Sequence, residues 1–336
     1  MHDVSVLTRD TIGLRHDTRV IGSALAAAGI TLKAYFPRRR NLDLLFCRML
    51  LTLFSTFSFQ KRRRPQVNIF IEQIMPGWLP HADCNILIPH QEWCRPETQV
   101  LLKRIDHVLC KTRYAEEIFC ALGYKTSFVG FSSEDRFLKD VSKNFDKFLH
   151  VAGRSQQKGT RVISQVWAMH PEWPELTIVT RNPQLVEYGH ECRNIRVVTD
   201  VLSNSALVAM QNEFGVHLCL SEAEGFGHYI CEAMSCGAIV VATNAPPMNE
   251  LVTPERGVLV DFCETRTQSL GTNFYAAPES LEKVIDRLLS MGYEEKTKLS
   301  KAAREWFLVN DENFKHRFPG VLLEVLQEFL EREQFH

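Results

Sequence analysis

The chain has 336 residues, a length that fits two domains better than one. Hydrophobic residues make up 45% and charged residues 24%, which is the composition of an ordinary soluble globular protein and excludes general disorder. With 39 basic and 40 acidic residues the formal net charge is -1, so the basic excess of a general nucleic-acid binder is absent and no nucleic-acid partner is expected.

Ten cysteines are scattered along the chain without a Cys-x-x-Cys pair, so a zinc site has little support. Several lie inside apolar runs, as buried free thiols do, and a disulfide framework is improbable at this length. The first residues resemble a short strand rather than a secretory signal. These features predict a cytoplasmic location.

The first half of the chain alternates short apolar runs with amphipathic stretches. Strands are predicted at 4–7, 30–36, 67–70, 84–88, 107–110 and 127–129. Residues 8–16 are predicted as a polar loop around Gly13, and a helix is predicted at 18–28, with Asp17 as N-cap and Gly29 as its stop. Another helix is predicted at 114–122. The repeated strand–helix–strand order predicts a parallel sheet covered on both faces.

Residues 131–147 are polar and poor in periodic apolar residues, which predicts a linker. The second half then repeats the alternation. Strands are predicted at 148–152, 176–180, 195–198, 215–220 and 238–242, and helices at 162–169, 205–212, 226–236, 281–289, 296–308 and 321–331. The predicted architecture is therefore α/β, with two Rossmann-like doubly wound domains facing across a cleft. The first covers 1–143 and the second 144–336, with the terminal helix available to pack back on the first domain. Ligands of such sheets bind beyond the carboxyl ends of the strands.

The most informative stretch is 216–250, in which a buried strand ends at Ser221 and a glycine-containing loop leads into a helix. Gly225 and Gly227 let the backbone approach a ligand closely. The amino end of the helix attracts an anion such as a diphosphate. Glu224 and Glu232 are separated by seven residues, and carboxylates are strong acceptors for sugar and ribose hydroxyls. Taken alone, the loop also fits an ordinary strand–turn–helix with a solvated and a capping glutamate.

This segment resembles the signature of the large retaining glycosyltransferase family of GT-B fold, glycosyltransferase family 4. Its residues Ser221, Glu224, Gly225, Phe226, Gly227, Glu232, Ala233, Met234 and Gly237 match that pattern. A second match begins at the strand 148–152, which is followed by Gly153-Arg154 and, after a short loop, Lys158-Gly159. The resemblance implies that Arg154 and Lys158 hold the donor diphosphate, that Glu224 contacts the sugar and that Glu232 holds the ribose. Gly225, Phe226, Gly227 and His228 complete the expected donor-binding set. The loop from Arg154 to Lys158 is shorter than in many members of the family.

The resemblance is weaker in the first half. The family places a histidine at the end of a strand near the sugar, and His90 follows the buried run 84–88 here. His90 is therefore expected to be catalytic or to contact the sugar; Glu92 and a loop histidine without a role are the alternatives. Gly13 and Arg15 are expected on the acceptor side, in the first strand–helix loop. Lys111-Thr112 matches a family position whose implied role is structural.

Two basic clusters, Arg38–Arg40 and Lys61–Arg64, flank an apolar stretch with helical spacing. Such a helix can lie on an anionic membrane surface, which suits a lipid-linked acceptor and predicts a peripheral location on the cytoplasmic membrane face. A core helix with solvated flanks is the alternative, and a nucleic-acid contact is a third reading, which the missing basic excess disfavours.

The hypothesised activity is transfer of a hexosyl or other sugar from a nucleotide-sugar donor, such as a UDP- or GDP-sugar, to a glycan, lipid-linked or other hydroxyl acceptor, with retention. This is the chemistry of polysaccharide biosynthesis. No Asp-x-Asp occurs, and the resemblance implies no metal and no other cofactor. The alternatives are an epimerase or phosphorylase on the same fold and a non-catalytic nucleotide-sugar-binding scaffold.

Overall fold

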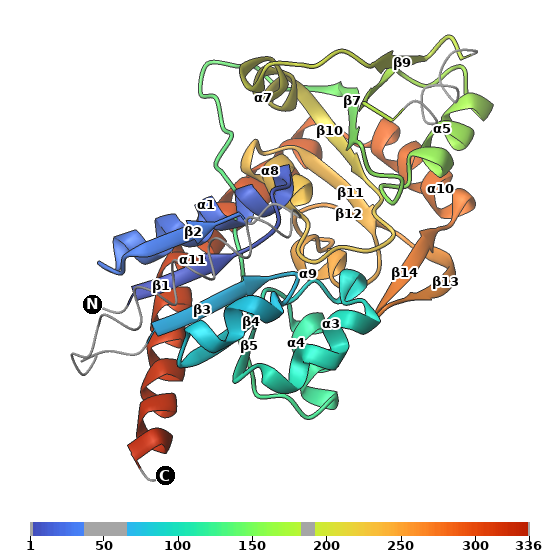
Figure 1. Ribbon diagram of the computed structural model, residues 1–336. Coiled ribbons are helices and arrows are strands. Elements are labelled where there is room, and N and C mark those ends of the chain that lie inside the picture. The colour runs from blue at the N-terminus through green and yellow to red at the C-terminus, as the bar shows by residue number, and fades with distance from the viewer. Residues whose placement is uncertain (1–2, 37–65, 183–191, 335–336) are drawn as a thin grey trace. The chain divides into compact units, whose positions relative to one another are not determined.

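The computed structural model describes residues 3–36, 66–182 and 192–334. It divides into two compact units (Figure 1). Unit 1 comprises residues 1–131 together with 312–336, and unit 2 comprises residues 132–311. Each unit contains a parallel sheet of six strands. The sequence predicts six strands in the first half and five in the second, and β12 (Val258–Val260) is the strand that it lacks.

The sheet of unit 1 has the strand order β2-β1-β3-β4-β5-β6, with all neighbours parallel. Its strands are β1 (Asp3–Leu7), β2 (Leu32–Tyr35), β3 (Gln66–Ile71), β4 (Cys84–Ile88), β5 (His107–Cys110) and β6 (Thr126–Phe128). The helices of this unit before residue 131 are α1 (Ile12–Ala27), α3 (Pro96–Leu101) and α4 (Arg113–Ala121), with short 3₁₀ turns η1 (Pro76–His81), η2 (Gln91–Trp93) and η3 (Leu102–Arg104). The chain leaves β1 toward β2 and then crosses to β3, so the order reverses between β1 and β3.

The sheet of unit 2 has the order β12-β11-β10-β7-β8-β9, again with all neighbours parallel. Its strands are β7 (Asn144–Gly153), β8 (Leu176–Thr180), β9 (Ile195–Val198), β10 (Phe214–Cys219), β11 (Ile239–Thr243) and β12 (Val258–Val260). The helices are α5 (Thr160–Met169), α7 (Asn204–Glu213), α8 (His228–Ser235), α9 (Met248–Leu251) and α10 (Pro278–Ser290). The order reverses between β7 and β10, and α5 and α10 lie on one side of this sheet with α7 and α8 on the other (Figure 1).

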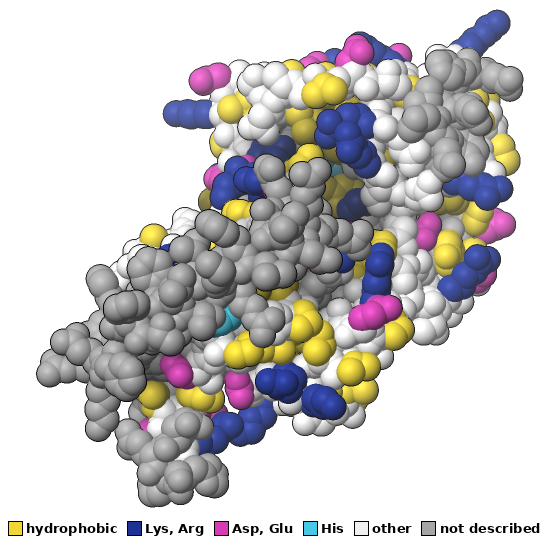
Figure 2. Space-filling model, viewed as in Figure 1, with side chains coloured by type: hydrophobic (Ala, Val, Ile, Leu, Met, Phe, Trp, Pro, Cys, Tyr) yellow, Lys and Arg dark blue, Asp and Glu magenta, His cyan; other side chains and the backbone are white. Residues whose placement is uncertain are grey.

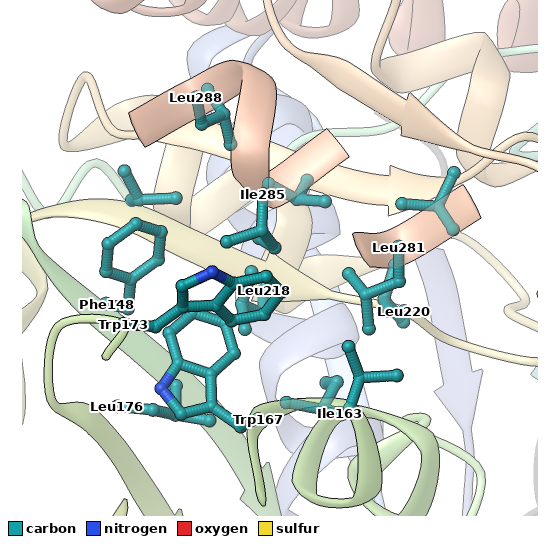
Figure 3. Close-up of a cluster of buried hydrophobic side chains, with 14 of the residues drawn as sticks. Phe148, Ile163, Trp167, Trp173, Leu176, Leu218, Leu220, Leu281, Ile285 and Leu288 are labelled. Atoms are coloured by element: carbon teal, nitrogen blue, oxygen red, sulfur yellow. The ribbon is translucent and has the colours of Figure 1, made fainter. Parts of the chain in front are cut away.

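The core of unit 2 shows why its strands are continuous apolar runs: helices cover both faces of a parallel sheet. Phe148 of β7 packs on Trp167 of α5 with ring centroids 5.1 Å apart, and Trp167 packs on Trp173 at 5.0 Å. Leu281, Ile285 and Leu288 of α10 close the cluster (Figure 3).

The segment predicted as a linker is bound to unit 2. Arg136 N donates to Ser235 Oγ at 3.1 Å, Leu138 N donates to Asn212 Oδ1 at 2.8 Å, and Ser132 Oγ donates to Asp311 Oδ1 at 2.8 Å. Unit 2 therefore begins at residue 132, twelve residues before the predicted start at 144.

The end of the chain forms one helix, α11 (Tyr293–Gln334), rather than the two predicted helices 296–308 and 321–331. It runs through Pro319, and its residues from Glu312 onward belong to unit 1. Phe314 and Phe318 are buried there, and Phe314 packs on Phe131 with ring centroids 5.0 Å apart.

Several elements have no counterpart in the prediction, namely α3, α9, β12 and a hairpin of two strands. After β12 the chain makes an antiparallel hairpin of β13 (Phe262–Gln268) and β14 (Gly271–Ala276). β13 is exposed along most of its length, whereas β14 is partly buried. Phe274 N donates to Glu222 O at 2.7 Å, so the hairpin is attached to the loop that follows β10.

Candidate active site

The loop between β7 and α5 lies at the point where the strand order of the second sheet reverses. Arg154 is exposed in the turn directly after β7, and Lys158 is half-buried, two residues before the first residue of α5. Gly159 takes a left-handed conformation with φ of 70°. A Cβ at this position would lie 2.3 Å from the carbonyl oxygen of Leu220, so only glycine lets this loop approach the end of β10.

The loop after β10 is joined directly to the first loop. Glu222 N donates to Gln157 O at 2.9 Å, and Thr243 Oγ1 at the end of β11 donates to Ser221 O at 2.8 Å. The two sequence matches, separated by some 60 residues in the chain, therefore meet at the carboxyl edge of the sheet, where ligands of such sheets bind.

Lys158 and Glu224 form an ion pair in which both side chains are largely buried. Ser221 Oγ donates to the same Glu224 oxygen at 2.5 Å and lies 2.6 Å from the Tyr229 hydroxyl. The Lys158 ammonium stands 3.5 Å from the centroid of the Tyr229 ring. The sequence did not single out Tyr229, although it is the second residue of α8 and lies two residues after Gly227.

Helix α8 begins immediately after this cluster, two residues later than predicted. Its N-cap is Gly227, with φ of 105°, and a Cβ there would come within 3.1 Å of Leu251 Cδ1. Gly225 and Phe226, in the loop between β10 and α8, are buried. The centroid of the Phe226 ring lies 5.6 Å from that of the His228 ring. His228 Nδ1 is 2.7 Å from Ser133 Oγ, so the segment before β7 holds the first residue of the helix.

Glu232 lies on the buried side of α8. Its carboxylate is 3.1 Å from Arg136 Nη2, and Gln211 Nε2 donates to it at 3.5 Å. Burial raises the pKa of Glu232, and Arg136 counteracts this effect. Arg136 belongs to no recognisable motif and lies in the segment predicted as a linker. The sequence therefore contains no indication of its ion pair with Glu232.

His90 follows β4 in unit 1 and belongs to a separate charged cluster. Its Nε2 is 2.9 Å from Lys111 Nζ and 3.4 Å from Asp17 Oδ2, and its Nδ1 is 3.5 Å from Glu72 Oε2. Burial and the Lys111 ammonium oppose protonation of His90, but hydrogen bonds to Asp17 and Glu72 raise its pKa to about 9. Both ring nitrogens are engaged, and the nearby alternative Glu92 is buried.

The predicted loop of residues 8–16 is wrong, because α1 already begins at Ile12 with Thr11 as its N-cap. Gly13 and Arg15 therefore lie in the first turn of the helix. Arg15 pairs with Asp10 at 2.5 Å while remaining about half exposed. Asp17, the predicted N-cap, is instead a buried residue inside α1, where it pairs with Lys111 at 2.7 Å.

A cavity of about 500 Å³ lies beside the loops that follow β7 and β10, between α5 and the β13–β14 hairpin. Arg161 and Gln165 of α5 line it, together with Glu222, Arg266 and Tyr275. Burial raises the pKa of Glu222, and Arg266 opposes that shift. Lys158, Glu224 and Arg154 do not line this cavity, so it is distinct from the cluster at the reversal of strand order.

The two basic clusters Arg38–Arg40 and Lys61–Arg64 lie outside the described residues. On the face shown in Figure 2, the Lys and Arg side chains of the described residues occupy several separate places among Asp and Glu. Among the described residues, none of the helices has the length and apolar character needed to cross a membrane.

The two parallel six-stranded sheets with helices define an α/β fold of the GT-B glycosyltransferase class. A sequence model of the family described as glycosyl transferases group 1 matches residues 132–306, slightly more than half of the chain. The chain belongs to this family, and the resemblance noted from its motifs is confirmed. Family membership supports sugar transfer from a nucleotide-sugar donor as the class of activity. No curated protein sequence matches this chain.

Solved structures share the fold at low sequence identity. Sucrose-phosphate synthase from Thermosynechococcus elongatus superposes with a TM-score of 0.65 at 16% identity, covering 100% of this chain and 99% of that chain. HepE from Anabaena, in complex with UDP and glucose, gives 0.65 at 13% identity and covers 100% of each chain. The pneumococcal O-GlcNAc transferase GtfA, in complex with UDP and GlcNAc, gives 0.63 at 13%, covering 84% of this chain and 60% of that chain.

Proposed function

We propose that this protein is a retaining glycosyltransferase that moves a hexosyl group from a UDP- or GDP-sugar to a hydroxyl group of a glycan or lipid-linked acceptor. The observation that carries the proposal is the ion pair between Lys158 and Glu224 at the reversal of strand order in unit 2. It joins the two family motifs in one place, beside the amino end of α8.

In this proposal the donor diphosphate is held by Lys158, Arg154 and the start of α8. An ammonium has three N–H donors, so Lys158 can bind a phosphate oxygen while it keeps Glu224 as a partner. Arg154 is exposed at the end of β7 and can place its planar guanidinium on two phosphate oxygens. These positive groups stabilise the negative charge that develops on the leaving diphosphate.

The two glutamates then have different tasks. Glu224 lies in the loop and contacts the sugar hydroxyls, with its carboxylate fixed by Ser221 and Lys158. Glu232 holds the ribose hydroxyls, and the same carboxylate retains Arg136, because an ionised carboxylate can accept about four hydrogen bonds. The bond from the anomeric carbon to the diphosphate breaks, the acceptor oxygen bonds to that carbon on the same face, and the hydroxyl proton passes to the departing diphosphate.

No metal is needed in this scheme, because the cations of the donor loop neutralise the leaving group. Activity should be the same with and without EDTA. Loss of turnover in the chelator, restored by added Mg²⁺ or Mn²⁺, would contradict the metal-free assignment.

The decisive experiment is Glu224→Gln, assayed by release of nucleoside diphosphate from a panel of UDP- and GDP-sugars. We expect turnover to fall about 100-fold or more, in the range found when one preorganised group that stabilises transition-state charge is removed. Glu175→Gln, an exposed residue of the same unit, is the matched control and should behave as wild type. Normal turnover in Glu224→Gln removes Glu224 from the mechanism. Binding of a nucleotide sugar by the wild type without release of its diphosphate would instead identify a non-catalytic scaffold.

A further inference from the structure

The carboxyl edge of the first sheet has its own reversal of strand order, between β1 and β3. The two strands are parallel, with Leu7 opposite Phe70, so they end at nearly the same level. Thr8 directly follows β1, and Glu72 directly follows β3. Open parallel sheets bind ligands in the crevice at such a point, so these two residues flank the expected position of a ligand in unit 1.

Glu72 has an unusual backbone for a glutamate. Its φ is 67°, in the left-handed region that favours glycine. Its backbone N–H donates to Ile88 O at 2.9 Å, which ties it to the end of β4. Strained non-glycine residues of this kind cluster at ligand-binding and active sites. Glycine would adopt this positive φ without strain, so the backbone alone does not explain why a glutamate occupies the position.

The side chain of Glu72 is held from behind by a chain of charged groups. His90 Nδ1 is 3.5 Å from its Oε2, and His90 Nε2 is 2.9 Å from Lys111 Nζ. Lys111 pairs with Asp17 at 2.7 Å and lies 4.3 Å from the centroid of the Phe131 ring. Because the pKa of His90 is raised to about 9, its ring is protonated at neutral pH. Its Nδ1–H then points to Glu72 and its Nε2–H to Asp17, and Lys111 donates to Asp17.

This arrangement leaves the carboxylate, rather than the imidazole, as the group that can bind a substrate. Both nitrogens of His90 are engaged within the cluster, whereas a carboxylate has about four acceptor sites. The Glu72 side chain is 16% exposed, compared with 1% for Asp17 and for Lys111. Burial raises the pKa of Glu72, but His90, Arg9 and Lys111 together lower it, so its carboxylate is ionised at neutral pH.

Thr8 supplies an independent sign of a ligand at the same place. The residue is fully buried, and its hydroxyl has no hydrogen-bond partner among the residues that the structure describes. Buried hydroxyls without a partner are uncommon, because desolvation of a polar group costs free energy unless a hydrogen bond replaces water. A bound hydroxyl at the β1–β3 reversal would provide such a partner.

We propose that Glu72 binds hydroxyl groups of the acceptor substrate at the carboxyl edge of the first sheet, and that His90, Lys111 and Asp17 are positioning residues for its carboxylate. The proposal rests on the glycosyl-transfer function given above and names the acceptor-binding group. The acceptor therefore presents hydroxyl donors at this point, rather than a phosphate or carboxylate group that Glu72 would repel.

The test measures binding of simple sugars to the full chain by NMR titration. The probes are methyl α-glucoside, methyl α-mannoside and methyl β-galactoside, with glucose 6-phosphate as an anionic comparison. At least one neutral glycoside should bind the wild type, and Glu72→Gln should weaken that binding about tenfold or more, because a hydrogen bond to a charged group is lost. Glu97→Gln, an exposed residue of the same unit, should bind as the wild type does.

The positioning residues have a different expected result. Glu72→Asp keeps the charge and should restore part of the affinity that Glu72→Gln loses. His90→Gln should weaken glycoside binding less than Glu72→Gln and should shift the pH at which binding is lost, because the Glu72 carboxylate loses its imidazole partner. Equal affinity in wild type and Glu72→Gln, or a failure of all three neutral glycosides to bind the wild type, overturns the proposal.

Nucleotide binding separates this proposal from the proposed function. UDP and GDP should bind wild type and Glu72→Gln alike, because the donor residues belong to unit 2. If neither nucleotide nor any nucleotide sugar is bound, the transferase function fails; glycoside binding that depends on Glu72 would still stand.

Discussion

Lys111 and Asp17 form an ion pair in which each side chain is only 1% exposed. Removing one partner of such a pair leaves the other charge buried without compensation, whereas replacing both with apolar residues is often neutral. The sequence indicated only a structural position at Lys111. It could not indicate Asp17 as its partner, because these residues are 94 positions apart and meet through the order of the sheet.

We therefore predict that Lys111→Met lowers the free energy of unfolding by about 3–5 kcal/mol, measured by urea denaturation. The double variant Lys111→Met/Asp17→Leu should recover most of that loss. Lys147→Met breaks a partly exposed pair with Glu213 and should cost at most about 1 kcal/mol. A double variant no more stable than Lys111→Met alone would show that the loss does not come from an uncompensated charge.

His150 lies fully buried in β7, with Nδ1 2.7 Å from the Leu218 carbonyl oxygen and Nε2 2.8 Å from Thr160 Oγ1. A carbonyl oxygen only accepts, so Nδ1–H donates to Leu218 and Nε2 accepts from Thr160. Burial, reinforced by Lys158, lowers the pKa of His150 to about 4. The neutral imidazole thus ties β7 to β10 and to the first residue of α5.

This depressed pKa predicts a loss of stability in acid. The unfolded chain binds a proton at His150 near pH 6.5 and the folded chain only near 4, so stability is full above pH 6.5 and falls between these values. The contribution of His150 is on the order of 3 kcal/mol. Urea midpoints at pH 7.5 and pH 4.5 should differ less in His150→Gln than in the wild type. His316→Gln, at an exposed position, should keep the wild-type difference.

For single residues of the site, the sequence predicts which residue types are present better than it predicts the partners that they contact. Lys158, Glu224 and Gly227 were found because they match the motifs of the family, and the structure brings Lys158 and Glu224 together. Their roles in binding remain predictions. Arg136, Ser133 and Glu72 were missed, because each acts through partners that only the folded chain brings near.

Among the elements, the loop from β7 to α5 depends most strongly on one residue. Gly159 combines a left-handed backbone with a contact that leaves no room for a Cβ against Leu220. Gly123 has a similar φ of 82° but has open space around its Cβ position. A comparison of Gly159 with Gly123 therefore distinguishes the free-energy cost of backbone strain from the cost of a steric clash.

Gly123→Ala should therefore cost about 1–2 kcal/mol, from backbone strain alone. Gly159→Ala should cost clearly more, because the loop must also withdraw from β10, and it should weaken nucleotide binding by moving Lys158. Thermal melting and a UDP and GDP titration measure the two effects. Equal losses of stability in the two variants would mean that the loop adapts without cost.

The strands were predicted more closely than the helix ends. β4, β5, β8 and β9 have the predicted bounds, because short buried apolar runs flanked by polar residues define parallel strands well. The start of α1 was misplaced because Asp17 resembles an N-cap, whereas Thr11 accepts from Leu14 N and leaves Asp17 to Lys111. α11 continues through Pro319 because Phe314 and Phe318, one helical turn apart, remain buried.

For the molecule as a whole, the α/β class and the parallel sheets followed from the alternation of strands and helices, whereas the boundary between the two units did not. Residues 132–143 look like a linker in the sequence, but their hydrogen bonds to α7 and α8 make them part of unit 2. The last segment of α11 returns to unit 1 through aromatic packing on Phe131.

Phe314→Ala tests how far unit 1 depends on that segment. Phe314 is 2% exposed. Its replacement by alanine should lower the free energy of unfolding by about 3–5 kcal/mol. Leu323→Ala, on the exposed side of the same helix, is the control and should cost less than about 1 kcal/mol. UDP and GDP binding should be unchanged in native Phe314→Ala, because the residues proposed to bind the donor belong to the other unit. A loss below 1 kcal/mol would show that the segment contributes little to unit 1.

The return of α11 to unit 1 also sets an order of events during synthesis on the ribosome. Domains usually fold as they emerge, the amino-terminal one first. Here unit 2 is a single continuous stretch, finished at Asp311, while unit 1 still lacks its closing helical segment. The nascent amino-terminal half must therefore wait, with the surface that receives Phe314 and Phe318 uncovered, until translation has passed the later unit. This interval is where chaperone binding to the nascent chain is expected.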